Sequence, residues 1–483
     1  MADLVIRKKN EVFLRVECDP HIKHELQDQF TFDVPGAKFM PQYRNKYWDG
    51  KIRLFNMDRG EIYCGLIDKL QVFCERYSYT FEFEENKHYG LPYEENDSFS
   101  EEGVRDYLTT ISKYKPRDYQ VEGVTDALRR NRRLLISPTA SGKSLMIYSI
   151  CRYHVENSRK ILLIVPTTSL VEQMYKDFED YGWDAEKNCY KIYGGAPRNT
   201  DQSVIISTWQ SIYKLDRKWF ANFEVVIGDE AHQFKSKSLV NIMTKMADTK
   251  YRYGFTGTLD GTQTHKWVLE GLFGPSYKII STKKLQDAGY LAKLNIKILL
   301  MKHEPQKFDL YEDEVQYIIS NEKRNKFIKN LAHDLKGNTL ILYSRVATHG
   351  QVLFDLINIG NRKVFFVHGG VDAQEREEVR RITETEKDAI IVASFGTFST
   401  GINIKNLHNI IFASPSKSRI RTLQSIGRVL RKGNNKVSAT LFDIADDTKK
   451  GSRNNYTLNH LIERIKYYNE EKFNYEILQI KIG

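Results

Sequence analysis

Short runs of apolar and often β-branched residues alternate with segments of helical length from about residue 105 onward. Such runs are typical of parallel strands that helices cover on both faces. The first set of predicted strands is Arg133–Ser137, Ile161–Pro166, Ser203–Thr208, Val225–Asp229 and Tyr253–Thr256. The alternation begins again after about residue 290, with strands predicted at Thr339–Ser344, Lys363–His368, Ala389–Ser394, Asn409–Ala413 and Ala439–Ile444. The pattern therefore predicts two α/β lobes in tandem.

The two ends of the chain have other patterns. Apolar and polar positions alternate from Val5 to Val16 as in a strand, His21–Phe30 has the pattern of a short helix, and Lys51–Phe55 that of a strand. A polar, acidic stretch from Glu94 to Glu102 indicates a domain boundary, and Leu458–Lys472 has helical spacing. We expect an N-terminal accessory domain of α+β type (residues 1–100), a first lobe (105–285), a second lobe (286–450) and a C-terminal helical tail (451–483).

Length and composition agree with a globular protein of several domains. The chain has 483 residues, of which 41% are hydrophobic, enough for the cores of about three domains. No run approaches the roughly 18 apolar residues of a membrane span, and the N-terminus lacks a signal pattern. Five cysteines without a Cys-x-x-Cys pair argue against a disulfide framework or a zinc ribbon. We therefore expect a cytoplasmic protein with reduced cysteines and no membrane partner.

The charge balance is basic. The net charge is +11 and the isoelectric point is about 9.1. A basic protein suits a polyanionic partner such as nucleic acid, although many basic proteins bind none.

The segment Ser137–Ser144 has the pattern of a phosphate-binding loop between a strand and a helix. The small residues of such a loop let backbone N–H groups point at phosphate oxygens, and the helix N-terminus adds positive charge. Lys143 would reach the β- and γ-phosphates of ATP, and Ser144 would ligate Mg²⁺. Ser137 replaces the usual first glycine, so a chance Gly-Lys-Ser at a helix start is the alternative. The residues expected around the phosphates are Thr139, Ala140, Ser141, Gly142, Lys143 and Ser144.

Two carboxylates end the predicted strand Val225–Asp229. Ligands of open α/β sheets bind at the carboxyl ends of the strands, where Asp229 and Glu230 would lie. Asp229 would hold Mg²⁺ through water, and Glu230 would act as general base on the attacking water. A salt-bridged structural pair is the alternative.

Arg428 and Arg431 lie three residues apart, which places them on one face of a helix. Guanidinium groups brought from the second lobe to the γ-phosphate would act as arginine fingers. Alone, such a pair more often forms a solvated basic face; the neighbouring Gln424 and Gly427 favour the catalytic interpretation.

In this order along the chain, the motifs resemble those of superfamily 2 helicases of the DExH type, over residues 110–450. The resemblance implies two RecA-like lobes and ATP hydrolysis with Mg²⁺. It also implies nucleotide contacts for Arg117 and Gln120, which lie in a segment similar to the adenine-recognition motif, and for His232 and Gln424. The DNA contacts that it implies are Thr167, Thr168, Gly195, Thr208 and Thr400. Arg345, Lys405, Lys417 and Arg419 would add charge to this surface, and their alternative is a solvated basic face.

A closer resemblance is to the UvsW-type family of phage branched-DNA helicases. It rests on phrases such as Gly401-Ile-Asn-Ile-Lys405, Gln424–Lys432 and Tyr47-Trp48-Asp-Gly-Lys51. The last phrase interleaves aromatic and basic residues, which can stack on bases and pair with phosphates; a hairpin with an aromatic core is the alternative. The resemblance favours DNA binding by Tyr47, Trp48 and Lys51.

That resemblance implies an ATP-dependent helicase that unwinds or branch-migrates forks, Holliday junctions and R-loops in phage replication, recombination and repair. Its partners would be branched DNA and RNA–DNA hybrids, and we expect a monomer in the host cytoplasm. The alternatives are a duplex translocase or RNA helicase without junction preference, and a non-catalytic binding protein with a vestigial ATP site.

Overall fold

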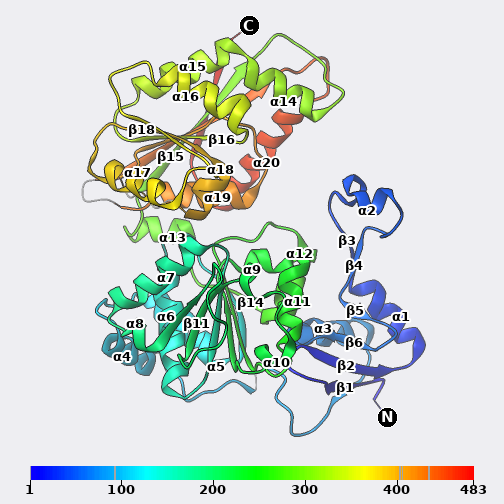
Figure 1. Cartoon of the computed structure of the whole chain (residues 1–483). Helices are drawn as coiled ribbons and strands as arrows, with labels where there is room; N and C mark the ends of the chain where they lie inside the picture. The colour runs from blue at the N-terminus through cyan, green and yellow to red at the C-terminus, as the bar shows by residue number, and fades with distance from the viewer. Residues whose placement is uncertain (1, 92–93, 402–403, 405, 433–435, 483) are drawn as a thin grey trace. The chain divides into compact units, whose positions relative to one another are not determined.

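The computed structural model describes residues 2–91, 94–401, 404, 406–432 and 436–482. It divides into two compact units. The first comprises Met1–Ser137 and Gly142–Ile279, and the second comprises Pro138–Ser141 and Ile280–Gly483. The architecture is α/β: each unit contains a seven-stranded parallel sheet with helices on both faces, and the first also carries a small N-terminal α+β domain (Figure 1).

The N-terminal domain is built on a five-stranded sheet with the order β5-β6-β2-β1-β7. The prediction of one strand from Val5 to Val16 is wrong: the segment forms two antiparallel strands, because the Asn10 side chain accepts hydrogen bonds from the N–H groups of Val12 (2.8 Å) and Phe13 (2.9 Å) and closes a turn. The elements are β1 (Leu4–Lys8), β2 (Phe13–Cys18), α1 (Pro20–Gln29), β5 (Phe55–Asn56), β6 (Glu61–Tyr63), η2 (Cys64–Leu66), α3 (Ile67–Tyr77) and β7 (Phe81–Phe83).

An arm projects from this domain between α1 and β5 (Figure 1). Its two legs are the antiparallel strands β3 (Thr31–Asp33) and β4 (Lys51–Arg53), and its tip carries η1 (Ala37–Phe39) and α2 (Pro41–Arg44). The predicted strand Lys51–Phe55 is thereby divided: β4 pairs with β3, and β5 pairs with β6.

The first seven-stranded sheet follows the order β10-β11-β9-β12-β13-β8-β14. All five predicted strands are confirmed, and the two edge strands β10 and β14 are additional. The strands are β8 (Arg132–Ile136), β9 (Ile161–Val165), β10 (Cys189–Ile192), β11 (Val204–Thr208), β12 (Val225–Gly228), β13 (Tyr251–Thr256) and β14 (Ser276–Lys278). The helices are α4 (Glu101–Ile111), α5 (Asp118–Arg129), α6 (Lys143–Glu156), α7 (Thr168–Tyr181), α8 (Ala185–Asn188), α9 (Trp209–Ile212), α10 (Arg217–Phe220), η4 (Ala231–Lys235), α11 (Lys237–Lys245) and α12 (Gln263–Phe273).

The N-terminal domain and the first sheet share one hydrophobic core. A single cluster of buried residues runs from Leu4 and Phe73 of the small domain to Ile164 and Phe273 of the sheet and its helices. At the junction the backbones touch: a Cβ on Gly65 would lie 2.0 Å from the carbonyl oxygen of α12 residue Glu270, so only glycine fits there. The small domain and the first lobe therefore form one folded unit. They are connected by this packing as well as by the acidic boundary segment.

The second sheet has the order β17-β18-β16-β19-β20-β15-β21. The five predicted strands and the C-terminal helix are confirmed, whereas β15 and β21 were not predicted. The strands are β15 (Lys293–Lys302), β16 (Thr339–Tyr343), β17 (Val364–Val367), β18 (Ile390–Ser394), β19 (Asn409–Phe412), β20 (Ser438–Asp447) and β21 (Tyr475–Lys481). The helices are α13 (Thr282–Asp287), α14 (Tyr311–Ser320), α15 (Glu322–Asp334), η5 (Val346–Gly350), α16 (Gln351–Ile357), α17 (Ala373–Thr385), α18 (Phe395–Gly401), α19 (Arg419–Val429) and α20 (Tyr456–Glu470).

The two sheets have the same topology. Counted by their place along the chain, the strands of each sheet lie in the spatial order third, fourth, second, fifth, sixth, first, seventh, and all neighbours are parallel. All five cysteines are free thiols, and four of them are buried. Among the described residues, no helix combines the length and apolar character needed to cross a bilayer.

Candidate nucleotide site and nucleic-acid surface

The phosphate-binding loop leaves β8 and enters α6 with two residues in the left-handed conformation. Ala140 has φ +67° and Gly142 has φ +82°. A side chain at Gly142 is excluded for a second reason, because its Cβ would lie 2.3 Å from Nε2 of Gln120. Left-handed residues beside right-handed ones turn successive N–H groups to one side and form an anion-binding nest. The loop therefore has the backbone that the sequence predicted for a phosphate cradle.

Lys143 and Ser144 open the 14-residue helix α6, directly after this loop. The hydroxyl of Ser144 lies 2.7 Å from the phenol oxygen of Tyr181, the last residue of α7. Burial raises the pKa of Tyr181 above its usual value, so this phenol stays protonated at neutral pH. Tyr181 was not predicted; it lies 37 residues away and belongs to no motif.

The two carboxylates follow β12, whose four residues are fully buried. Asp229 is 8% exposed, and its Oδ1 accepts a hydrogen bond of 2.9 Å from the N–H of Glu230. Burial and then the charge of Glu230 raise the pKa of Asp229 to about 6, while the charge of Lys143 opposes that rise. Glu230 has φ +49°, a strained conformation for a residue with a side chain, of the kind that clusters at functional sites.

His232 joins the acidic segment to the end of β13. Its Nδ1 lies 3.1 Å from Oγ1 of Thr256 and 3.3 Å from Oε2 of Glu230. Thr256 itself donates from Oγ1 to the carbonyl oxygen of Thr258 (3.1 Å). The carboxyl edge of the first sheet thus gathers Lys143, Asp229, Glu230 and His232, as the sequence predicted.

The two residues predicted to recognise adenine begin α5. Oε1 of Gln120 accepts the backbone N–H of Arg117 (2.9 Å), which closes a capping box at the helix start. The Arg117 guanidinium donates to the phenol oxygen of Tyr119 (2.8 Å). Since Gln120 is 4% exposed and lies against Gly142, it connects this motif to the phosphate loop. Base recognition by either residue stays a prediction.

The second unit carries Gln424 and both arginines. Gln424 (8% exposed) and Arg428 lie on α19, and the Arg428 guanidinium lies 5.9 Å from the centre of the Phe398 ring. The prediction that Arg428 and Arg431 share one helical face is wrong. The helix ends at Val429, and Arg431 lies beyond it, where its backbone pairs with Leu291 in an antiparallel bridge.

The residues predicted to contact DNA in the first unit have different surroundings. Thr167 caps α7 by accepting the N–H of Leu170 (3.3 Å), and the exposed Thr168 begins that helix. Gly195 has φ +89° and open space around it, which leaves its backbone accessible to a phosphate. Thr208 is only 4% exposed, with its hydroxyl 2.9 Å from that of Ser211, so its side chain is not presented at the surface.

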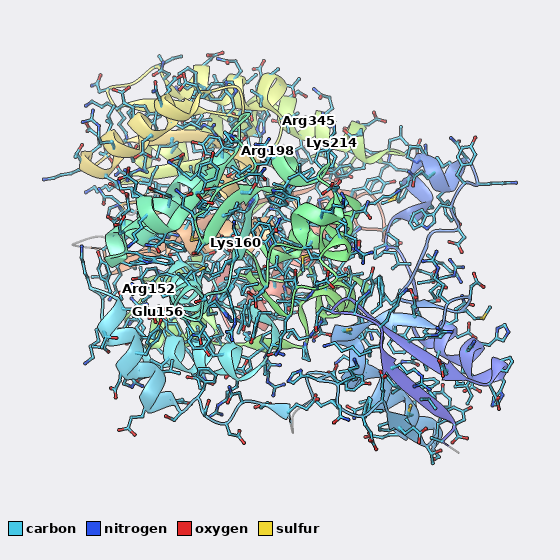
Figure 2. The ribbon with its side chains drawn as sticks, turned by 60° about the horizontal axis from the view of Figure 1, so that its bottom comes forward. Arg152, Glu156, Lys160, Arg198, Lys214 and Arg345 are labelled. Carbon is cyan, nitrogen blue, oxygen red and sulfur yellow. The ribbon has the colours of Figure 1, made fainter. Side chains whose placement is uncertain are left out.

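In the second unit, the guanidinium of Arg345 is held by two side chains of α14. It pairs with Glu312 and donates to Oε1 of Gln316 (3.1 Å); Figure 2 labels this arginine. Arg419 similarly pairs with Glu470 of α20 (2.5 Å). Thr400 lies in α18, but its side chain is outside the described residues, as is Lys405.

Among the described residues of the N-terminal domain, the most exposed aromatic side chains lie on the arm. Tyr47 is 84% exposed, and Phe39 is 66% exposed. Trp48 is half-buried, with its indole N–H donating to the carbonyl oxygen of Lys51 (2.8 Å), so it stabilises the arm from within. The three residues that were predicted to bind DNA therefore differ in their surroundings: Tyr47 and Lys51 face solvent, while Trp48 has a structural contact.

Comparison with known proteins agrees with this arrangement. Three family models match: the one described as "Type III restriction enzyme, res subunit" over residues 113–261, "DNA helicase UvsW, N-terminal" over 3–84, and "Helicase conserved C-terminal domain" over 322–433. The ATP-dependent DNA helicase uvsW of Enterobacteria phage T4 is 34% identical over 498 residues, covering 97% of this chain and 98% of the phage T4 protein. The DNA 3'-5' translocase XPB2 of Sulfurisphaera tokodaii is 25% identical and covers 66% of this chain and 79% of its own length.

Solved structures give the same result. The crystal structure of T4 UvsW matches with a TM-score of 0.53 and 33% identity over 100% of both chains. Dbp5 of S. cerevisiae, bound to RNA and ADP BeF3, matches with a TM-score of 0.55 over 79% of this chain and 93% of its own; at 13% identity it shares the fold alone.

Two RecA-like sheets of one topology, with a P-loop and an Asp-Glu-Ala-His segment on the first, define a superfamily 2 helicase of the DExH type. The full-length match places it more closely: the chain belongs to the family of the phage UvsW helicases.

Proposed function

We propose that this protein is an ATP-dependent DNA helicase that unwinds or branch-migrates branched DNA, including forks, Holliday junctions and R-loops, in phage replication, recombination and repair. The structural feature that supports a branched DNA substrate is the arm. Its exposed aromatic and basic tip belongs to a domain that shares one core with the ATP-binding lobe. A stacking surface fixed to a motor lobe can hold a branch point while the motor moves the strand.

At the nucleotide, Lys143 would neutralise the β- and γ-phosphates from the start of α6, where the helix dipole also favours negative charge. Ser144 and, through water, Asp229 would hold Mg²⁺; the buried Asp229, whose pKa is raised, and the adjacent half-buried Glu230 fit a cation in this place. Mg²⁺ would neutralise charge that develops on the phosphates. Glu230 would orient and deprotonate the attacking water, while Arg428 and Arg431 would supply guanidinium groups from the second unit.

The DNA strand would be held mainly through its phosphates. Thr168, the N-terminus of α7 and the open backbone at Gly195 offer hydroxyl and N–H donors that fix a strand without reading its sequence. Arg345 would contribute by exchanging its ion pair with Glu312 for a phosphate. RNA–DNA hybrids would be accepted because phosphate contacts do not distinguish the two strands. We infer further that the protein acts as a monomer in the host cytoplasm.

The alternative is an ATP-driven duplex translocase or an RNA helicase without junction preference. The similarity to a protein named as a DNA 3'-5' translocase favours the first of these. Strand separation measured on forked DNA, plain duplex DNA and duplex RNA of equal length separates the possibilities. We expect ATP-dependent separation of the fork to exceed that of both other substrates. Equal rates on plain and forked DNA would favour the translocase, and a preference for duplex RNA would overturn the proposal.

A further inference from the structure

A chain of polar contacts leads from the acidic segment to the start of α12. After His232, the same 3₁₀ helix (η4) ends at Lys235, whose ammonium pairs with Asp260. The Asp260 carboxylate also binds the ring of His265, on the first turn of α12. Burial alone would raise the pKa of Asp260, but the hydrogen bonds from His265 and Lys235 outweigh it and hold the carboxyl ionised. The loop after Thr256 therefore leads directly into α12, and η4, which follows Glu230, is tied to the start of α12 through Lys235 and Asp260.

The next turn of α12 contacts the base of the arm. The Trp267 ring centre lies 5.5 Å from that of Phe30 and 5.1 Å from that of Phe32, the latter at an interplanar angle of 80°. Edge-to-face pairs at this distance are favourable beyond the area that they bury. Phe32 belongs to β3 and pairs across the arm with Ile52 of β4, and the carbonyl oxygen of Phe30 accepts the N–H of Leu54 (2.9 Å). One indole therefore packs against the point where both legs of the arm are tied together.

The C-terminal half of α12 is fixed to the same domain. The ideal Cβ of Gly271 would lie 2.9 Å from Cβ of Tyr63, and the backbone of Gly65 lies against Glu270. A close-packed helix transmits a displacement of one end to its neighbours, because a packed core does not deform continuously. α12 is thus a rigid connection between the loops at the nucleotide edge and the root of the arm.

We propose that Trp267 is a positioning residue that couples ATP turnover to strand separation. It holds the base of the arm in a fixed position relative to the loops that follow Glu230 and Thr256. The inference rests on the proposed function. When nucleotide moves those loops, α12 moves the arm with them, and the work of hydrolysis reaches the branch point. Without the indole, the motor still hydrolyses ATP, but the arm no longer follows it.

The test compares Trp267→Ala with the wild-type chain on a forked duplex, measuring base pairs opened per ATP hydrolysed and, separately, ATP turnover stimulated by linear single strands. We expect turnover to stay within about twofold, while the number of base pairs opened per ATP falls about tenfold, as for a misplaced positioning group. Trp267→Phe keeps a ring against Phe32 and should recover most of that ratio.

Two further variants keep the test decisive. Phe32→Ala removes the same contact from the arm and should give the same loss, and the double variant should be no worse than either single one. Trp219→Ala is the matched control, because Trp219 packs against the same core cluster without touching the arm base. An unchanged ratio in Trp267→Ala, additive losses in the double variant, or an equal loss in Trp219→Ala would overturn the inference. A wild-type chain that fails to separate the fork would instead count against the proposed function.

Discussion

The two sheets of this protein have the same topology, but the polar residues at their carboxyl edges have different roles. In the first sheet, the carboxyl ends of the first, fifth and sixth strands position three polar residues for phosphate binding: Lys143 at the start of α6, Asp229 directly after β12, and Thr256 at the end of β13. In the second sheet the corresponding region is closed by buried ion pairs. The guanidinium of Arg324 binds both oxygens of Asp446 (2.8 and 2.9 Å), and His303 donates to one of them (2.8 Å).

This difference between the two edges shows that the fold alone does not specify the chemistry. Identical strand orders supply two identical edges, but in the first sheet β8 is followed by a loop with left-handed Ala140 and Gly142 and by a helix that begins with Lys143. At the other edge, side chains on β20 find partners on α15 and α20, and the polar groups stabilise the lobe instead of a ligand. Function lies in the loops grafted on the sheet. The comparison predicts that polar substitutions at the first edge change activity and those at the second change stability.

The largest effect is expected from Asp446→Asn. Both partners of this carboxylate are buried, so its removal leaves the Arg324 charge uncompensated and should cost about 3–5 kcal/mol of unfolding free energy. Urea unfolding followed by circular dichroism measures it. Burial would raise the pKa of Asp446, but the charge of Arg324 and its hydrogen bonds lower it from 3.8 to about 2. The wild-type advantage should therefore be complete above pH 4 and shrink as the pH falls towards 2. A loss below 1 kcal/mol at pH 7 would contradict a structural role.

Next in size is Lys143→Ala. Removing a preorganised charge at the phosphates should lower ATP turnover by at least about a hundredfold, or about 3 kcal/mol. Since Lys143 is partly exposed, the unfolding midpoint should not change. Phosphate release with saturating forked DNA gives the rate. Lys323→Ala, at an exposed lysine of α15, is the matched control and should keep normal turnover. Retained turnover in Lys143→Ala would remove the ATP site from the first edge.

A smaller effect is expected at the arm. Tyr47 is 84% exposed, so Tyr47→Ala should leave stability unchanged and weaken binding to forked DNA by about 1–2 kcal/mol, the loss of one stacked base. Fluorescence anisotropy with a labelled fork measures the change. Tyr77→Ala, at a 47% exposed tyrosine of α3 away from the arm, should bind normally. Equal affinities for both variants would argue against the arm as a DNA surface.

The smallest effect is expected from Glu156→Gln. Glu156 pairs with Arg152 on the surface of α6 (3.0 Å; Figure 2), and its side chain is 44% exposed. Surface pairs contribute little because water screens them, so the variant should lose less than about 1 kcal/mol and keep its ATP turnover. Urea unfolding beside Asp446→Asn makes the comparison direct. Losses of equal size in the two variants would show that burial does not distinguish these pairs.

Much of the fold could be predicted because central strands are buried on both faces and have continuous apolar runs. Edge strands lack that signal: β10 contains Tyr190 and Lys191, which are only half-buried, and β21 is mostly exposed. The prediction of a helical tail therefore missed β21. The shared core of the N-terminal domain and first lobe was also unexpected, since the acidic segment at Glu94 suggested a linker and no local pattern reveals a distant packing partner.

The candidate site could be predicted where its residues are contiguous. Lys143 and Glu230 lie in short motifs with fixed spacing, and the structure brings them to one edge as expected. Tyr181, Asp260 and Trp267 belong to no such motif, because each acts through a contact that only the folded chain creates. Arg431 shows the opposite error. A spacing of three residues predicts a shared face only while the helix continues, and here it ends at Val429.

The number of nucleotide sites is the most direct test of the account, because both sheets offer the same topology. Titration calorimetry with a non-hydrolysable ATP analogue and Mg²⁺ should give one site per wild-type chain, with affinity lowered about tenfold or more in Lys143→Ala. Two sites per chain, or equal affinity in the variant, would contradict the claim that only the first edge binds nucleotide.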